Sequence, residues 1–450
     1  MTAILVAAAV GLLLALLGTP LLIRFLHRRE YGQFIRQDGP QGHFTKRGTP
    51  TMGGLVIILA TVLGYGAANL IELRTPRASG ILLLFLIVGL GLIGFLDDFE
   101  KISKQRSLGL RAWQKIAGQA LIGITFSVTA LRFADRNGLT PASTRVSFAS
   151  DTNIDLAFAG AGAGLVLFVL WANFLITAWS NAVNLTDGLD GLAAGIIGIG
   201  STAFFMYTYV LTRATSPGSY SSLAATIVAA LIGVCVGFLP HNFNPATIFM
   251  GDSGAMQLGL VSAASTIIVT GQIDPGSFDG SRALPAFMPI LLPLAVLLLP
   301  LTDMIMAIVR RTRKGLSPTH PDRMHMHHRL LAAGHSHRRA VLVMYLWAAV
   351  ASFPVAAMAF FPLPWVMVGA GIAVLFAFVV TVDLMPGVRH GLRSALRRRR
   401  GRQEHRIVVS RNVSGTGEVT RPAEGQAPQG AVVSATVSTA PAHHPEETDA

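Results

Sequence analysis

Apolar residues dominate eleven stretches of about 20 residues, the length at which a helix crosses the hydrocarbon core of a bilayer. Short polar segments separate these stretches. The pattern therefore predicts an all-α polytopic membrane protein with about eleven transmembrane helices. The stretches cover residues 3–24, 52–72, 80–97, 113–132, 157–179, 191–212, 222–239, 255–270, 284–309, 341–361 and 364–385.

The composition agrees with a membrane protein. Of the 450 residues, 52% are hydrophobic and 13% are charged, whereas a soluble domain carries about 25% charged residues. The first stretch has no small-residue cleavage pattern and is read as a retained span rather than a removed signal. The only cysteine, Cys235, lies inside an apolar stretch, which excludes a disulfide framework and a cysteine-based zinc site.

Lysine and arginine indicate the orientation. Of the 36 such residues, 29 follow the odd-numbered stretches, lie at the adjoining helix ends or belong to the C-terminal tail. The positive-inside rule places these segments in the cytoplasm and the N-terminus on the other side of the membrane. This topology and attraction to anionic lipid explain the net charge of +13, so no nucleic-acid partner is expected.

The chain changes character near its C-terminus. Residues 1–386 form the predicted transmembrane domain. Residues 387–450 begin with the basic segment "RHGLRSALRRRRGRQEHR" and continue rich in Ser, Thr, Pro, Ala and Gly. This composition predicts a disordered cytoplasmic tail.

The unusual polar residues gather on one face of the membrane. Every segment after an odd-numbered stretch is dense in Asp, His, Lys, Asn and Gly, whereas the even segments, such as "TRATSPGSYS", are plain connectors. This predicts one composite site at the cytoplasmic surface. A secondary transporter, the remote alternative, more often places its charges near the bilayer midplane on broken helices.

Three groups of aspartates are candidates for chemistry. Asp97 and Asp98 end the third stretch, where carboxylates oppose the helix dipole and call for a cationic partner; a solvated helix end is the alternative. Asp187 and Asp190, in "DGLDG", form either a polar turn or a ligand site. Asp252, in "FMGDSG", is either an N-cap or a hard oxygen ligand. Mg²⁺ or Mn²⁺ with a phosphorylated substrate suits such aspartates.

Basic residues complete the candidate site. His325, His327 and His328 in "HMHHRL" lack the Glu of a zinc-protease motif and lie beside arginines, which favours anion recognition. Lys46 precedes a Gly/Thr/Pro turn and is either a phosphate ligand or a positive-inside anchor. His335 and His337 are read as solvated or lipid-contacting, and Asp303 is left out of the site because pairing with a neighbouring helix explains it equally well.

In their order along the chain, these motifs resemble the polyprenyl-phosphate N-acetylhexosamine-1-phosphate transferases. The resemblance covers the membrane region to about residue 385. "DGPQGHFTKRGTPTMGG", "DDFEKISKQRSLGLRAWQK" and "SNAVNLTDGLDGLAAG" resemble the phospho-N-acetylmuramoyl-pentapeptide branch. "GFLPHNFNPATIFMGDSGAM" and "SPTHPDRMHMHHRLLAAGHSHRRAVL" resemble the GlcNAc-1-phosphate branch. The chain is thus a mosaic, either a divergent homologue or a constructed hybrid.

The resemblance implies roles for individual residues. Asp97 and Asp98 would form the acidic pair near the metal and the lipid phosphate, with Asp98 a candidate base. Lys46 and Lys115 would bind phosphates. Asn184, Asp187 and Asp190 would line the nucleotide pocket, and Phe249 would stack on uracil. Asp252 would ligate Mg²⁺. Contact with the diphosphate or sugar would come from His325, His327 and His328.

The expected function is transfer of an N-acetylhexosamine 1-phosphate from a UDP-sugar to undecaprenyl or decaprenyl phosphate, with release of UMP. GlcNAc is slightly favoured as the sugar because the last histidine segment matches that branch. The alternative is phospho-MurNAc-pentapeptide transfer, which forms lipid I. The resemblance also implies a homodimer in a bacterial inner membrane, with the active site facing the cytoplasm.

Overall fold

The computed structural model describes most of the membrane region, and Lys46 and the tail 387–450 lie outside the described residues. The described residues are 1–29, 31, 48–73, 75–76, 78–106, 109–134, 140–149, 152–214, 220–270, 291–317 and 324–383.

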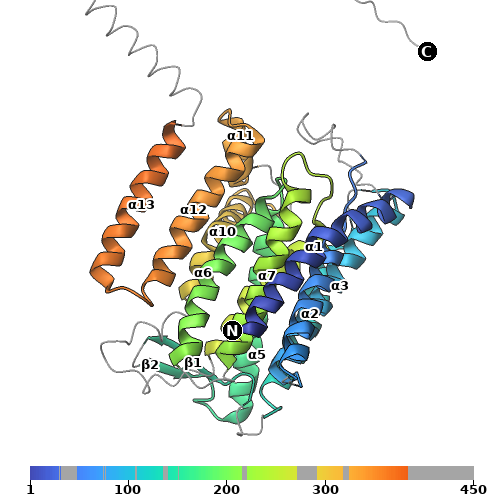
Figure 1. Cartoon of the computed structure of the whole chain (residues 1–450). Helices are drawn as coiled ribbons and strands as arrows, with labels where there is room; N and C mark the ends of the chain where they lie inside the picture. The colour runs from blue at the N-terminus through green and yellow to red at the C-terminus, as the bar shows by residue number, and fades with distance from the viewer. Residues whose placement is uncertain are drawn as a thin grey trace, which may run out of the picture. The chain divides into compact units, whose positions relative to one another are not determined.

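Helices make up nearly all of the described chain (Figure 1). They are α1 (Thr2–Arg28), α2 (Gly54–Ile71), α3 (Ala78–Ser103), α4 (Ala112–Ala130), α5 (Ala161–Thr186), α6 (Leu192–Ala214), α7 (Tyr220–Asn242), α8 (Gly251–Thr270), α10 (Leu298–Arg313), α11 (Met326–Ala332), α12 (His337–Ala357) and α13 (Leu363–Asp383).

The prediction of a helical membrane protein is confirmed. Eight described helices are long and apolar enough to cross a membrane: α1, α2, α3, α5, α6, α7, α12 and α13. Each of the eleven predicted stretches overlaps a helix, although the ninth, 284–309, lies partly outside the described residues. The count of eleven spans and the orientation of the chain stay predictions.

The helices pack into a bundle in which neighbours in space are often distant in sequence. α1 packs on α7 and α2, and α8 lies against both α3 and α5. Glycines allow the closest approaches: a Cβ added at Gly54 would lie 2.1 Å from the backbone nitrogen of Gly254. α8 is therefore held centrally, with its first turn beside the end of α3.

A short β-hairpin interrupts the helical pattern between α4 and α5. Strands β1 (Arg145–Ala149) and β2 (Thr152–Asp155) pair antiparallel, and the Thr144 hydroxyl donates to Asp155 Oδ1 at 2.8 Å. The hairpin lies at the same end of the bundle as the N-terminus, whereas α11 lies at the opposite end (Figure 1). The all-α prediction missed it because strands of four and five residues in a polar loop give too little alternation to detect.

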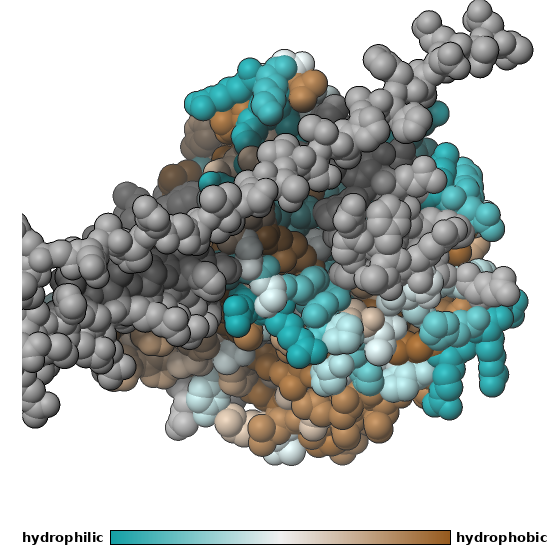
Figure 2. All heavy atoms as spheres, turned by 90° about the horizontal axis from the view of Figure 1, so that it is seen from above, coloured by the Kyte–Doolittle hydropathy of each residue, from teal (hydrophilic) through white to brown (hydrophobic). Residues whose placement is uncertain are grey.

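The end of the bundle that carries α11 is the polar one. Seen from that end, hydrophilic residues gather over the helix ends and hydrophobic residues form much of the flank (Figure 2). The acidic end of α3, the turn after α5, the start of α8 and the histidine segment all belong to this end, as the contacts among them show.

Candidate active site

Three aspartates from two helices meet in one cluster. Asp97 and Asp98 lie in the last two turns of α3, and Asp252 is the second residue of α8. One oxygen of each carboxylate lies within 4.8 Å of the others. Asp97 and Asp98 are fully buried. The prediction placed Asp97 and Asp98 at the end of the helix, but α3 continues to Ser103, and both carboxylates are paired inside the protein.

The first turn of α8 is bound directly to Asp98. The backbone N–H groups of Asp252 and Ser253 donate to the two Asp98 oxygens at 3.2 and 3.1 Å. These N–H groups have no partner within their own helix and carry its positive partial charge, so a carboxylate stabilises them. A Cβ at Gly94 would lie 2.5 Å from the Asp252 backbone, so only glycine permits this contact between α3 and α8.

Two lysines neutralise the aspartates. Lys101 Nζ lies 2.6 Å from Asp97, 3.0 Å from Asp252 and 3.5 Å from Asp98. Lys115, from α4, lies 3.0 Å from Asp97 and also forms a short ion pair with Asp252. The sequence predicted only that the acidic pair needs a cationic partner, and Lys101 was not among the predicted site residues. Its place four residues after Asp97, on the same face of α3, is the signal that points to it.

The end of α5 and the α5–α6 turn contribute two kinds of residue. The Asn184 amide points to Asp252 Oδ2 at 3.5 Å and so belongs to the cluster. Asp190 instead accepts hydrogen bonds from the Asn244 amide at 3.0 Å and the Ala246 N–H at 3.3 Å. Asp190 therefore ties this turn to the segment between α7 and α8. Asp187 is half-buried at the end of α5.

The histidine segment is held by a buried carboxylate. Asp303 Oδ2 lies 3.1 Å from His325 Nδ1, and its Oδ1 accepts the Met326 N–H at 3.0 Å. Asp303 is thus a residue of the site region that the sequence analysis left out. Its partner lies 22 residues away on a different element, so sequence spacing gave no sign of the pair.

His327 is the most enclosed of the three predicted histidines. Its side chain lies over the backbone of Gly188, where an added Cβ would be 2.3 Å from Nε2, and its ring centroid is 4.3 Å from that of His328. Burial, with a contribution from His328, lowers the pKa of His327 to about 3. A neutral imidazole therefore faces the α5–α6 turn.

The interpretation of His335 and His337 as solvated or lipid-contacting residues is wrong. His335 is buried. His337 Nε2 accepts the backbone N–H of Asp190 at 2.9 Å. Isolated histidines in a basic segment resemble a surface pattern, but α12 begins against the α5–α6 turn and brings His337 to it.

Phe249 lies in a segment that pairs with the chain before α2. Its N–H donates to the Pro50 carbonyl at 2.8 Å, and its own carbonyl accepts the Gly53 N–H at 2.9 Å. The side chain is half-buried. These two bonds join the first and fourth polar segments beside Asp252.

The donor set fits a hard divalent cation. Three carboxylates supply only oxygen ligands, the kind that Mg²⁺ and Mn²⁺ prefer. The lysines give the same cluster two ammonium groups for phosphate oxygens. Such a buried array can hold a polyanion in a fixed place and offset negative charge that develops on it.

Comparison with known proteins supports this class of chemistry. Residues 80–270 match the family model described as glycosyl transferase family 4, and residues 46–58 match phospho-N-acetylmuramoyl-pentapeptide-transferase signature 1. Phospho-N-acetylmuramoyl-pentapeptide-transferase of Beutenbergia cavernae is 61% identical over 280 residues, covering 60% of this chain and 78% of the relative. The protein of the same name from Kineococcus radiotolerans is 51% identical over 291 residues, covering 61% and 79%.

Fold and site define a helical, multi-pass membrane protein with a buried carboxylate–lysine centre at one end, and its relatives are bacterial. The chain belongs to glycosyl transferase family 4. The prediction of a membrane-bound sugar-phosphate transferase is therefore confirmed, and the relatives favour the phospho-MurNAc-pentapeptide alternative over the GlcNAc interpretation.

Proposed function

We propose that the protein transfers phospho-MurNAc-pentapeptide from its UDP-linked donor to a polyprenyl phosphate, forming lipid I and releasing UMP. The observation that carries this proposal is the name shared by relatives that are 48–61% identical to the chain. The signature that matches at residues 46–58 belongs to the same type of enzyme. The GlcNAc reading rested on the last histidine segment alone.

The transfer needs charge neutralisation more than covalent help. An oxygen of the lipid phosphate attacks the β-phosphorus of the donor, the bond between that phosphorus and the UMP oxygen breaks, and UMP leaves. Lys101 and Lys115 are placed to bind phosphate oxygens around this centre. Both lysines already form ion pairs with Asp97 and Asp252, so their ammonium groups are held in position before the substrate binds.

Asp97, Asp98 and Asp252 are the proposed metal-binding group. Mg²⁺ bound there would supply Lewis-acid stabilisation of the diphosphate. Asp252 is the best placed ligand, because it is the only one of the three carboxylates that is not fully buried. Asp98 has both oxygens in hydrogen bonds to α8, so we assign it first to positioning Asp252.

The other predicted residues complete the proposed substrate site. Asn184 and Asp187 lie at the end of α5 and would face the nucleotide, with Phe249 available for stacking on uracil. His327 and His328 would contact the sugar phosphate or diphosphate from α11. As a neutral imidazole, His327 offers hydrogen bonds rather than a positive charge.

The decisive experiment offers purified protein a polyprenyl phosphate together with either UDP-MurNAc-pentapeptide or UDP-GlcNAc and measures UMP release. We expect turnover with the pentapeptide donor and little or none with UDP-GlcNAc. Asp252→Ala should abolish release with either donor. Preference for UDP-GlcNAc would restore the original sugar assignment, and undiminished turnover in Asp252→Ala would remove Asp252 from the metal site.

A further inference from the structure

A cavity of about 350 Å³ lies between four helices at the polar end of the bundle. Its walls include Leu299 from α10, Met326, Arg329 and Leu330 from α11, Trp347 from α12 and Thr381 from α13. Thr381 is near the last residue of α13, and Trp347 is at the middle of α12. Since α12 and α13 are both candidate spans, the cavity reaches from the headgroup level into the bilayer core.

The walls are apolar except for one charged side chain. The Trp347 indole N–H donates to the Thr381 hydroxyl at 3.1 Å, and that hydroxyl donates to the Ala377 carbonyl at 2.7 Å, so both polar groups are already paired. Arg329 is exposed, and no described carboxylate forms an ion pair with it. An apolar cavity with a guanidinium beside it matches an acyl chain that ends in a phosphate headgroup.

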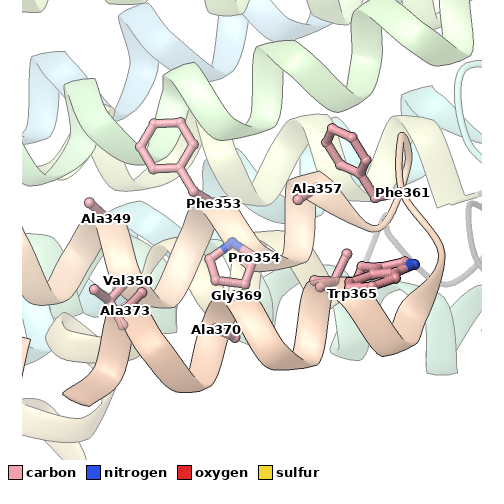
Figure 3. A pocket seen from close by; sticks show the side chains of 11 residues that line it. Ala349, Val350, Phe353, Pro354, Ala357, Phe361, Trp365, Gly369, Ala370 and Ala373 are labelled. Carbon is pink, nitrogen blue, oxygen red and sulfur yellow. The ribbon is translucent and has the colours of Figure 1, made fainter. Parts of the chain in front are cut away.

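A second cavity, which has no arginine, shows why Arg329 makes the first cavity the better candidate for an anionic lipid. It has a volume of about 520 Å³ and lies between α12 and α13, lined by apolar and aromatic residues such as Phe353, Phe361 and Trp365 (Figure 3). It has no charged group in its walls, so it offers nothing to select one lipid over another. The smaller cavity has both parts of a lipid site.

We propose that the cavity between α10, α11, α12 and α13 binds one anionic phospholipid, with an acyl chain in the cavity and the headgroup phosphate on Arg329. This site goes beyond the proposed transferase function and does not depend on it. It also gives Arg329, which stands beside the histidines in sequence, a role different from theirs.

The bound lipid would pack against the face of α11 that points away from the α5–α6 turn, and so stabilise the position of the histidine segment. Met326, Arg329, Leu330 and Ala333 all line the cavity, at spacings of three, four and seven residues that define one face of a helix. His327 points instead to Gly188. Filling the cavity therefore holds α11 against the α5–α6 turn.

Native mass spectrometry of the detergent-purified full chain, with phosphatidylglycerol or phosphatidylcholine added, tests the proposal. We expect one phosphatidylglycerol to be retained by the wild type, and Arg329→Gln to weaken its binding about fivefold, the effect of one basic residue at an anionic lipid. Arg313→Gln is the matched control, because Arg313 is also exposed and ends α10 outside the cavity. Its retention should equal that of the wild type.

Ala333→Phe tests the acyl-chain part separately and keeps Arg329 intact. It should displace phosphatidylglycerol by filling the cavity, while an unchanged melting temperature shows that the bundle still folds.

Equal losses of lipid binding in Arg329→Gln and Arg313→Gln would overturn the proposal, since any surface arginine would then bind the headgroup equally well. So would full lipid retention in Ala333→Phe. Displacement of phosphatidylglycerol by stoichiometric polyprenyl phosphate would also overturn it, because the cavity would then belong to the lipid substrate.

Discussion

Both carboxylate oxygens of Asp303 contact polar groups of the histidine segment. One oxygen fixes the ring of His325 and the other holds the first N–H of α11. Both side chains are buried, so the pair is shielded from water and its geometry is maintained by packing. A buried carboxylate that orients an imidazole sets which ring nitrogen faces the site.

Asp303→Asn should lower kcat about 10- to 100-fold, the usual cost of losing a group that orients a functional histidine. KM for the lipid phosphate should change little, because Asp303 does not reach the aspartate–lysine cluster. Steady-state UMP release measures both constants. Asp155→Asn, in the hairpin at the other end, is the control and should keep full activity; wild-type kcat in Asp303→Asn would remove Asp303 from the positioning role.

His327 makes stability depend on pH. Its pKa is lowered from 6.5 to about 3 in the folded protein, so between these values the unfolded chain binds a proton that the folded chain does not. Folded-state stability should therefore be full above pH 6.5 and fall as the pH drops below it. At pH 5.5 the loss from this group is about 1 kcal/mol.

Thermal melts of the wild type and His327→Gln at pH 7.5 and pH 5.5 check this dependence. The variant should be less sensitive to acid than the wild type by about that amount. Parallel changes in the two proteins would show that His327 is already protonated, or titrates normally, in the folded state.

The sequence predicted Asp97, Asp98 and Asp252 because carboxylates at the ends of apolar helices carry a clear energetic cost, and the family resemblance implied Lys115. The structure brings these four residues together. The sequence did not predict the central position of Lys101, the pair formed by Asp303 or the contact of His337. Each of these depends on which helices become neighbours, and periodicity within one helix holds no information about its neighbours.

At the scale of helices, the contact between α3 and α8 determines the geometry of the cluster. Gly94 lies directly against the backbone that carries Asp252, and Gly109 lies against the Asp97 carboxylate, 2.4 Å from where a Cβ would stand. The neighbour of Gly94 is backbone, and the Asp97 carboxylate beside Gly109 is held by ion pairs with Lys101 and Lys115. Small changes at these glycines therefore shift carboxylates of the proposed metal-binding group.

Gly94→Ala should destabilise the protein by about 1–3 kcal/mol, as overpacking does in a close-packed interior, and should also reduce activity by moving Asp252. Gly66→Ala in α2 is the control, since nothing lies within 4 Å of its Cβ position, and it should be neutral or slightly stabilising. Melting temperatures and UMP release compare the two. Equal effects of both substitutions would show that helix propensity, not the α3–α8 contact, explains the loss.

Long helices were predictable and short elements were not. An apolar run of 20 residues in a bilayer satisfies its own backbone hydrogen bonds only as an α-helix. This is why every predicted stretch overlaps a helix. α11 has seven residues and the hairpin strands have four and five. Elements this short form through contacts such as Asp303 with Met326 and Thr144 with Asp155, which the local sequence does not specify.

At the scale of the whole molecule, the two ends of the bundle should face different compartments. The excess of Lys and Arg assigns the α11 end to the cytoplasm, and the hairpin lies at the other end (Figure 1). Phe158 is 79% exposed near the hairpin, and Arg313 is exposed at the end of α10.

Variants with one added cysteine check this orientation. Phe158→Cys should react with a membrane-impermeant maleimide in cells whose outer membrane is permeabilised, and Arg313→Cys should react only after lysis. The native Cys235 is buried and should stay unlabelled in both. The reverse pattern would invert the assigned topology.

The unequal lengths of α1 and α2 have a consequence for the membrane itself. These two helices pack together, yet they have 27 and 18 residues, or about 40 and 27 Å at 1.5 Å per residue. A bilayer core of about 30 Å matches α2 closely and is shorter than α1. α1 must then tilt or extend beyond the core. The pair therefore makes the protein sensitive to bilayer thickness. A thicker membrane would draw the ends of α2 into its core before it affected α1, and the N-terminal end of α2 carries the Gly54 contact with α8.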